Sequence, residues 1–376
     1  MTMLRFVWRA THAGAPDSAG FAIAQDHLFL RPDTGTDSKL QSFAKAKNDW
    51  QDVDGTLDHA VETWLTGRTL QGRVVVLVHG YCFDPGDHEK ATFDDDPYDG
   101  VYKNADEPTS WIPIVGANNA VCFAWNSMPS FGDSGRACWP NPYEYAVQEV
   151  SVLAARALAA IVSVFQRKGV KVDLFAHSLG TRVSCKALAW LRDKAQITEA
   201  VRRVILLGGA EYSIDALSDT RGVKTEIYNF AIRRDGVLKW GGSELGGKQR
   251  VPNSVASRVI GRDGVKCLPN WIDFQLDHSD PDNAEDFRRW FDNLGGYKLS
   301  GATAPEGGLH WAYYLHKDNR TLYRDILEND QLSIEWMRGQ AAPDGVDRFR
   351  YRELGGSPPK TPATCRGRHR LYDRER

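Results

Sequence analysis

The sequence predicts an α/β protein of three layers, in which helices cover both faces of a mostly parallel β-sheet. Two observations predict this fold class. Continuous apolar runs alternate with segments of helical periodicity through the middle of the chain, which is typical of βαβ units. The runs at residues 73–79 and 120–125 are not interrupted by polar residues, so we expect strands there that are buried on both faces. The 376 residues have room for one large α/β domain or two ordinary ones.

The first region, residues 1–72, is expected to be an N-terminal extension. Residues 4–10 (LRFVWRA) and 27–31 (HLFLR) have the composition of short strands. Residues 38–70 carry apolar side chains at helical spacing, which indicates one helix or two.

The main region, residues 73–328, has the clearest pattern. Apolar runs predict five strands, at residues 73–79, 120–125, 170–177, 201–209 and 225–232. Helical periodicity predicts helices at residues 143–167 and 181–194. Gly169 follows the first of these helices, where glycine commonly ends a helix.

The pattern is less regular after residue 232. Residues 241–264 are rich in glycine, serine and charge, so we expect a loop there. Residues 270–276 (NWIDFQL) are typical of a last strand, and residues 310–327 have helical periodicity. Residues 329–376 are expected to be a solvated tail, rich in proline and arginine above all from residue 340.

The balance of charge excludes some functions. Lys and Arg number 47 and Asp and Glu number 49, a formal net charge of −2, so we expect no nucleic-acid partner, which would require clustered positive charge.

The longest apolar stretch, residues 150–165, is interrupted by Arg156 and is shorter than the roughly 20 residues of a membrane-spanning helix. The N-terminus has no sustained apolar segment of the kind found in secretory signals. We therefore expect a cytoplasmic protein without an integral membrane segment.

The six cysteines form no CxxC pair and have no regular spacing. Reduced thiols fit this pattern best, and Cys122 and Cys185 lie in apolar segments that predict core positions. An extracellular disulfide framework is the alternative, because the number of cysteines is even.

The strongest chemical signal is Ala176-His177-Ser178-Leu179-Gly180, between a predicted strand and a predicted helix. A serine on such a sharp turn projects from the sheet edge with its hydroxyl exposed, and small residues on either side let strand and helix approach. The following helix directs its first N–H groups toward developing negative charge. Ser178 is therefore predicted to be a nucleophile, with a simple helix N-cap as the alternative.

These residues resemble the alpha/beta-hydrolase superfamily over about residues 73–328, through the segments VVVLVHGY, CFAWNS, DLFAHSLG and ILLGGAE. The turn Trp125-Asn126-Ser127 and the segment HWAYY at 310–314 are similar to bacterial alpha/beta hydrolases of unknown function. The superfamily commonly has glycine where this chain has Ala176, and alanine is still small enough for the turn. The resemblance implies a three-layer alpha/beta-hydrolase fold.

The resemblance also implies the chain order nucleophile, acid, histidine. Asp235, which follows the strand at 225–232, is at the position where the superfamily usually has its acid, and His310 follows Gly307-Gly308. In these roles His310 would accept the Ser178 proton, and Asp235 would fix the imidazole tautomer.

Other residues compete for these roles. Asp235 could instead be a turn residue, because it precedes Gly236. Asp215 and Glu211 are the alternative acids, and His278 is the alternative base.

The resemblance implies an oxyanion hole of two backbone N–H groups. Leu179 is expected to supply one because it follows the nucleophile, and Tyr81 the other, with Cys82 as its alternative. His79 is expected to support this loop, and His177 to have a packing or shaping role.

The loop at residues 82–113 is long, and between residues 84 and 99 it has seven acidic residues against one lysine. A solvated lid is the main expectation, and a Ca²⁺ site is the alternative, although the spacing matches no EF-hand. Aromatic side chains on nearby loops predict either an apolar pocket or core packing under a loop: Trp111, Trp125, Phe131 and Trp139.

The function expected from these residues is serine-dependent hydrolysis of a carboxylic ester through an acyl-enzyme, with a small-molecule substrate and no cofactor or metal. Two alternatives use the same chain: a binding module with a vestigial site, and an acyltransferase with the same three residues. The sequence does not specify the acyl group, the alcohol, a preference for ester over amide, or the oligomeric state.

Overall fold

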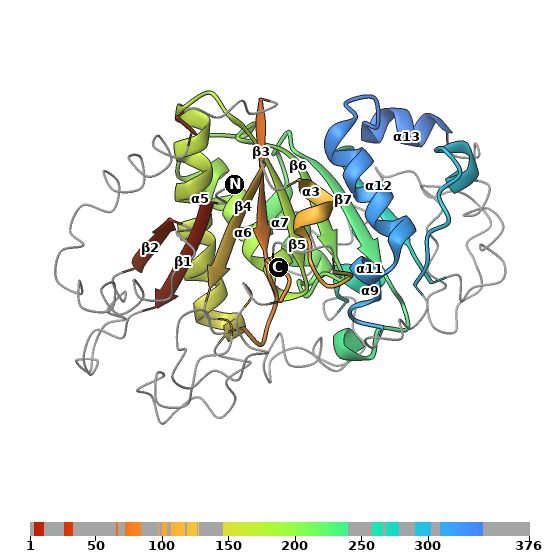
Figure 1. Ribbon diagram of the computed structural model, residues 1–376, viewed down its shortest axis with the longest axis horizontal. Helices are drawn as coiled ribbons and strands as arrows, with labels where there is room; N and C mark the ends of the chain where they lie inside the picture. The colour runs from red at the N-terminus through yellow and green to blue at the C-terminus, as the bar shows by residue number, and fades with distance from the viewer. Residues whose placement is uncertain are drawn as a thin grey trace, which may run out of the picture.

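The computed structural model of the protein is built around one eight-stranded sheet (Figure 1). It describes residues 4–10, 26–32, 65–66, 72–83, 97, 100–103, 107–116, 119–125, 127, 146–239, 258–265, 268–277, 290–301 and 309–340. For residues 4–10 and 26–32 only the backbone is described.

The sheet has the strand order β2-β1-β4-β3-β5-β6-β7-β8. Seven neighbouring strands run parallel, and β2 pairs antiparallel with β1 at one edge. The strands are β1 Leu4–Ala10, β2 Asp26–Pro32, β3 Arg73–Val78, β4 Ala120–Trp125, β5 Lys171–His177, β6 Val201–Leu207, β7 Glu226–Ala231 and β8 Trp271–Gln275. Each predicted strand is confirmed to within two residues at either end.

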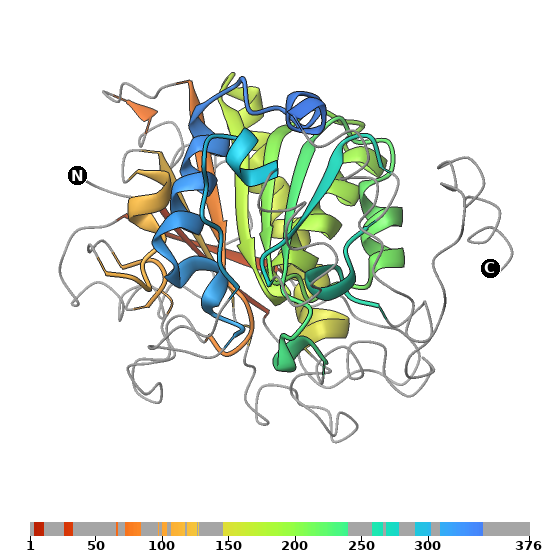
Figure 2. The ribbon, with the colours of Figure 1, turned by 90° about the vertical axis from the view of Figure 1, so that its right-hand side faces the viewer.

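The helices lie in two layers, one on each face of the sheet. On one face are the π-helical turn η3 Ala146–Val150, α5 Ser151–Arg167, α6 Leu179–Asp193, α7 Ser213–Thr220 and α9 Ile260–Asp263. On the other are α3 Ile112–Val115, α11 Ala312–Leu315, α12 Lys317–Glu328 and α13 Ile334–Gln340. Figure 2 shows the blue α12 and the orange α3 on one side of the strands and green helices on the other.

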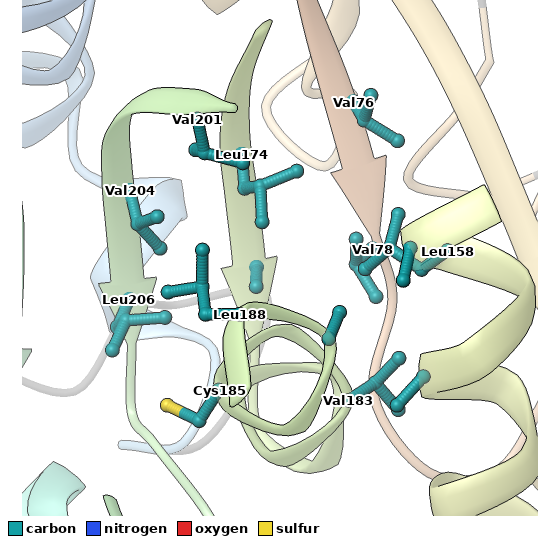
Figure 3. Packing of buried hydrophobic residues seen from close by; sticks show 14 of the residues in the cluster. Val76, Val78, Leu158, Leu174, Val183, Cys185, Leu188, Val201, Val204 and Leu206 are labelled. Atoms are coloured by element: carbon teal, nitrogen blue, oxygen red, sulfur yellow. The ribbon is translucent and has the colours of Figure 1, made fainter. Parts of the chain in front are cut away.

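Each central strand contributes to two separate apolar cores. In β3, Val74, Val76 and Val78 pack under α5 and α6, whereas Val75 and Leu77 face the opposite layer. Figure 3 shows the first of these cores, in which side chains of β3, β5 and β6 meet those of α5 and α6. Burial of both faces explains why β3 and β4 appear in the sequence as uninterrupted apolar runs.

The helix predicted at residues 310–327 is two helices. His316 has extended backbone angles (φ −79°, ψ 126°) and separates α11 from α12. The carbonyl of Tyr313 accepts hydrogen bonds from the side chains of Asn319 (3.1 Å) and Tyr323 (2.8 Å). Side chains from α12 therefore satisfy a carbonyl group that a continuous helix would use internally.

The packed region extends to residue 340. Beyond α12, the carbonyl of Leu332 accepts from the Tyr228 hydroxyl at 2.7 Å, and the amide of Ile334 donates to Glu226 at 2.8 Å. Ile334 and Met337 of α13 are buried against the sheet. The first twelve residues of the expected tail thus belong to the core layer, because strands β6 and β7 provide their partners.

Several predictions fall on residues that the structure does not describe: most of the helical segment at 38–70, residues 241–257 of the loop expected at 241–264, and the tail after 340. Near the end of that expected loop, Ile260–Asp263 is instead the short helix α9. The predicted helix at 143–167 is described from residue 146, where it begins as a π-helical turn. Within the described ranges, no helix is long and apolar enough to cross a membrane.

Candidate active site

Ser178 lies on a tight turn between β5 and α6. Its backbone angles are φ 53° and ψ −125°, a region that residues with a Cβ rarely adopt. Gly180 makes the turn possible, because a Cβ there would lie 2.4 Å from the carbonyl oxygens of Val78 and His79. The Ser178 hydroxyl makes no capping hydrogen bond to α6. The geometry is thus that of a side chain aimed away from its helix, as the nucleophile interpretation expects.

The hydroxyl of Ser178 faces His310. Its Oγ lies 2.9 Å from Nε2 of His310, and Nδ1 of His310 lies 2.7 Å from Oδ2 of Asp235. All three side chains are buried, with Ser178 8% and His310 6% exposed. The structure therefore brings together, in a single line of hydrogen bonds, the three residues that the sequence predicts for the triad.

Asp235 is held by donors on both of its oxygens. Oδ1 accepts from the backbone N–H groups of Val237 (2.9 Å) and Leu238 (3.2 Å), and Oδ2 accepts from His310 and from the Tyr313 hydroxyl. Burial alone would raise the pKa of Asp235, but the hydrogen bond and charge of His310 and the Leu238 N–H outweigh it and lower that pKa. An ionised carboxylate in this place favours a proton on Nδ1 of His310.

The turn that carries Asp235 is fixed by β8. Asp277, just beyond that strand, accepts from the backbone N–H of Arg233 at 2.9 Å and of Arg234 at 3.0 Å. Asp277 is itself buried and packs against Gly301, at which a Cβ would lie 2.7 Å from its amide nitrogen. The acid is therefore positioned by hydrogen bonds rather than by a flexible loop.

The loop after β3 lies directly against the serine. A Cβ on Gly80 would lie 2.7 Å from Cβ of Ser178 and 3.3 Å from its Oγ, so only glycine fits there. The Gly80 carbonyl lies 2.9 Å from Nδ1 of His79, which donates because a carbonyl can only accept. In a planar trans peptide the N–H of Tyr81 points opposite to that carbonyl, so His79 orients the predicted oxyanion donor.

His79 is in turn held in one tautomer. The amide of Trp125 donates to its Nε2 at 2.9 Å, while the Trp125 indole donates to its carbonyl at 3.0 Å. The hydroxyl of Tyr102 lies 2.8 Å from the His79 amide. Burial lowers the pKa of His79 to about 3, so the ring is neutral. Sequence reasoning missed Tyr102, because its position in the long acidic loop gives no sign of this contact.

The second predicted donor is the N–H of Leu179, the first residue of α6. The first N–H groups of a helix have no acceptor within it and lie at its positive end. Both predicted donors thus belong to segments that touch Ser178, and their role as an oxyanion hole stays a prediction.

The alternative residues lie elsewhere. Glu211 is buried and binds Arg182 at 2.6 Å and the Tyr212 amide at 2.9 Å, and burial raises its pKa. Glu211 thus bonds to a side chain of α6, the helix that follows Ser178, rather than to His310. Asp215 lies in the first turn of α7, and His278 lies outside the described residues.

Trp111 and Trp125 are fully buried. Both are core residues, whereas Phe131 and Trp139 are not described.

The part of the chain that the structure describes holds no group of three potential metal ligands, and almost all of the acidic segment at 84–99 lies outside it. Among the described cysteines Cys82 is exposed, and Cys122 and Cys185 are buried.

A parallel sheet with a serine on a strand-to-helix turn, beside an acid and a histidine from later segments, has the architecture of an alpha/beta hydrolase. Comparison with protein families supports this class. Residues 58–210 match the family described as alpha/beta hydrolase of unknown function (DUF900). This segment contains Ser178 and ends before Asp235 and His310. No curated protein and no solved structure matches the chain.

Proposed function

We propose that the protein hydrolyses a carboxylic ester through an acyl-enzyme, with Ser178 as nucleophile, His310 as general base and Asp235 as its orienting acid. The observation that carries the proposal is the 2.9 Å approach of His310 Nε2 to Ser178 Oγ. A serine hydroxyl is a weak nucleophile unless a base takes its proton, and Nε2 is free to do so because Asp235 binds the opposite ring nitrogen.

In the first half-reaction Ser178 Oγ attacks the ester carbonyl while its proton moves to His310 Nε2. The carbonyl oxygen becomes an oxyanion, which the N–H groups of Leu179 and Tyr81 are proposed to stabilise; each such donor contributes about 3 kcal/mol. When the intermediate collapses, the C–O bond to the alcohol breaks and His310 returns the proton to the leaving oxygen. Ser178 then carries the acyl group.

In the second half-reaction water attacks the acyl-enzyme. His310 takes a proton from the water, a second oxyanion forms in the same place, and collapse releases the carboxylic acid and restores the Ser178 hydroxyl. Asp235 stays ionised throughout and stabilises the imidazolium. Its lowered pKa supports this role.

Exposed apolar side chains next to the site support an ester with an apolar part. Trp311, which follows the base, is 43% exposed, and Val237, two residues after the acid, is 49% exposed. Their place in the chain beside the proposed base and acid makes these two side chains candidates for contact with the apolar part of the substrate.

The test is active-site labelling with a fluorophosphonate, followed by hydrolysis of p-nitrophenyl esters of increasing acyl length. The proposal expects one label per chain, loss of labelling and of hydrolysis in Ser178→Ala, and unchanged labelling in Ser184→Ala. Ser184 is the matched control, because it is a buried serine of α6 that bonds only to the Gly180 carbonyl among the described contacts.

An unlabelled wild-type protein, or labelling that persists in Ser178→Ala, would defeat the hydrolase proposal in favour of a binding module. Addition of a small alcohol separates the acyltransferase alternative. Formation of the new ester in preference to the free acid would show that water is not the natural acceptor.

A further inference from the structure

His177 directly precedes the serine and contacts the segment that carries the base. Its Nε2 lies 2.8 Å from the backbone carbonyl oxygen of His310. A carbonyl can only accept, so Nε2 of His177 carries the proton and donates it. This bond joins residues 133 positions apart in the chain, at the point where β5 meets the turn before α11.

We infer that His177 is a positioning residue for His310: its Nε2–H holds the turn that carries the base at hydrogen-bond distance from Ser178. The inference rests on the proposed function, since it assigns how the base of that reaction is kept in place. His310 then has three anchors, with its ring bound to Asp235 and facing Ser178 and its backbone bound to His177.

The three bonds fix different degrees of freedom. The ring contacts of His310 orient the imidazole, but they do not fix the distance of its backbone from β5. The bond from His177 does so, because His177 is covalently joined to Ser178. A displacement of about 1 Å between reacting groups can cost about 100-fold in rate, so this link matters more than its single hydrogen bond suggests.

The ring of His177 also packs among the aromatic rings of the same segment. Its centroid lies 4.7 Å from that of His310, 5.1 Å from Tyr314 and 6.0 Å from Tyr313. The ring centroid of Trp111, from the loop before α3, lies 6.3 Å from that of His177. Packing and hydrogen bonding are thus separable contributions, and a variant that keeps the ring but loses the donor distinguishes them.

His177 also has to remain neutral beside a residue that becomes cationic during the reaction. Burial, and secondarily the charge of His310, lower the pKa of His177 to about 3. The neutral ring keeps its single proton on Nε2 across the ordinary working range of pH. It therefore donates to the His310 carbonyl without adding a second positive charge.

The experiment compares His177→Gln with His177→Asn and His177→Phe. The amide nitrogen of glutamine can reach the position of Nε2, that of asparagine falls short, and phenylalanine keeps an aromatic ring without a donor. We expect kcat for a p-nitrophenyl ester to fall by about 10- to 100-fold in the Asn and Phe variants, with KM within about 3-fold of wild type. His177→Gln should keep kcat within about 3-fold.

Phe175→Leu is the matched packing control. Phe175 is buried on the same strand and packs against Trp111 at 5.3 Å. Its phenyl ring has no N–H group that could donate to the His310 carbonyl. It should lower the thermal midpoint without a selective fall in kcat. The inference is overturned if His177→Gln is as impaired as the other two variants, or if His177→Phe retains wild-type kcat. If His177→Phe does not fold, the Asn and Gln pair decides.

A second readout does not depend on catalysis. The proton between His310 Nδ1 and Asp235 should give a low-field proton NMR signal, assigned by its loss in Asp235→Asn. We expect this signal to disappear in His177→Phe and to remain in His177→Gln; a signal unchanged in His177→Phe overturns the inference. If wild-type protein is neither labelled nor active, the proposed function fails, and the NMR comparison still decides whether His177 positions His310.

Discussion

The hydroxyl of Tyr313 lies 3.2 Å from Oδ2 of Asp235, the same oxygen that faces His310. Tyr313 is three residues after His310, so one short segment provides both the proposed base and a donor to the proposed acid. The ring fits because position 208 is glycine, where a Cβ would lie 2.5 Å from a ring carbon of Tyr313. Burial raises the pKa of Tyr313 well above its ordinary value, so the hydroxyl stays protonated and can donate.

Removal of this hydroxyl should weaken both the site and the fold slightly. In Tyr313→Phe the ring stays but Asp235 loses one of its four donors, and a hydrogen bond of this kind contributes about 1 kcal/mol. We expect a free energy of unfolding lower by about 1 kcal/mol and a kcat lower by up to about 10-fold. Urea unfolding and ester kinetics measure the two effects.

Tyr323→Phe is the control for that variant. The Tyr323 hydroxyl donates to the Tyr313 carbonyl at 2.8 Å and not to the acid. It should cost similar stability and leave kcat unchanged. Equal kcat values for the two variants would argue against any role of the Tyr313 hydroxyl at Asp235.

The identity of the acid can be tested by amide substitution. Asp235→Asn keeps an oxygen that can accept from Val237 and Leu238, so the turn should still form. The amide cannot hold His310 in the tautomer with a proton on Nδ1, and comparable substitutions lower kcat by about 10⁴-fold. Steady-state kinetics of Asp235→Asn and of Asp215→Asn compare the two candidate acids. A large loss in Asp215→Asn with little loss in Asp235→Asn would reverse the assignment.

The fold is predicted to weaken in mild acid because of two buried histidines. Burial lowers the pKa of both His79 and His177 to about 3, whereas the pKa of a histidine in an unfolded chain is about 6.5. Between these values the unfolded chain binds protons that the folded chain does not. The free energy of unfolding is therefore fully retained above about pH 6.5 and falls with decreasing pH, by about 1.4 kcal/mol per pH unit for each histidine.

Urea unfolding at several pH values between about 7 and about 4 measures this slope. His177→Gln should reduce it by about 1.4 kcal/mol per pH unit, because glutamine does not titrate. Phe175→Leu removes a buried ring without removing a titrating group, so its stability should be lower by the same amount at every pH. Identical slopes in wild type and His177→Gln would contradict the prediction.

The sequence predicts the sheet well, because burial on both faces gives strands such as β3 and β4 an unbroken apolar pattern. It also predicts Ser178, whose strand-turn-helix context is entirely local. Asp235 and His310 were expected only from the chain order implied by the family resemblance. No local pattern links two residues that are 75 positions apart.

The supporting contacts could not be predicted for the same physical reason. Asp277 binds the acid-bearing turn, and Tyr102 binds the loop after β3, across 44 and 23 positions respectively. Such partners are decided by which strand ends meet at the sheet edge. The sequence also does not predict the break at His316. The side chains that bind the Tyr313 carbonyl in place of a helical N–H group belong to the next helix.

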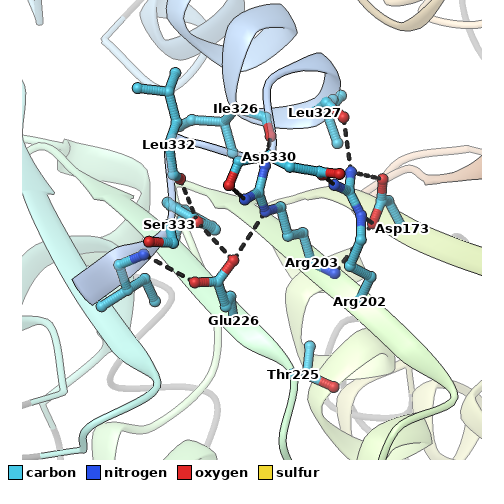
Figure 4. Close-up of polar contacts among 12 residues, drawn as sticks. Asp173, Arg202, Arg203, Thr225, Glu226, Ile326, Leu327, Asp330, Leu332 and Ser333 are labelled. Atoms are coloured by element: carbon cyan, nitrogen blue, oxygen red, sulfur yellow. Dashed lines mark hydrogen bonds and ion pairs between the residues drawn. The ribbon is translucent and has the colours of Figure 1, made fainter. Parts of the chain in front are cut away.

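Two arginines of β6, Arg202 and Arg203, hold the end of α12 to the sheet, as Figure 4 shows. Arg203 binds Glu226 at 2.9 Å and donates to the carbonyls of Ile326, Asn329 (2.9 Å) and Asp330 (3.2 Å). Its side chain is only 3% exposed. A planar guanidinium satisfies several carbonyls at a helix C-terminus at once, and it also complements the negative end of the helix.

Arg203→Lys keeps the charge but not this fork of donors, so most of these carbonyls would lose their partner. Loss of one member of a buried charged network costs about 3 kcal/mol, and we expect a decrease in the free energy of unfolding of about that size. Hydrogen exchange should rise mainly in α12 and α13. Since Arg203 is on the part of β6 remote from Ser178, kcat of the folded variant should stay near wild type. A large loss of kcat with unchanged stability would instead mean that the contacts of Arg203 with the end of α12 position the active site.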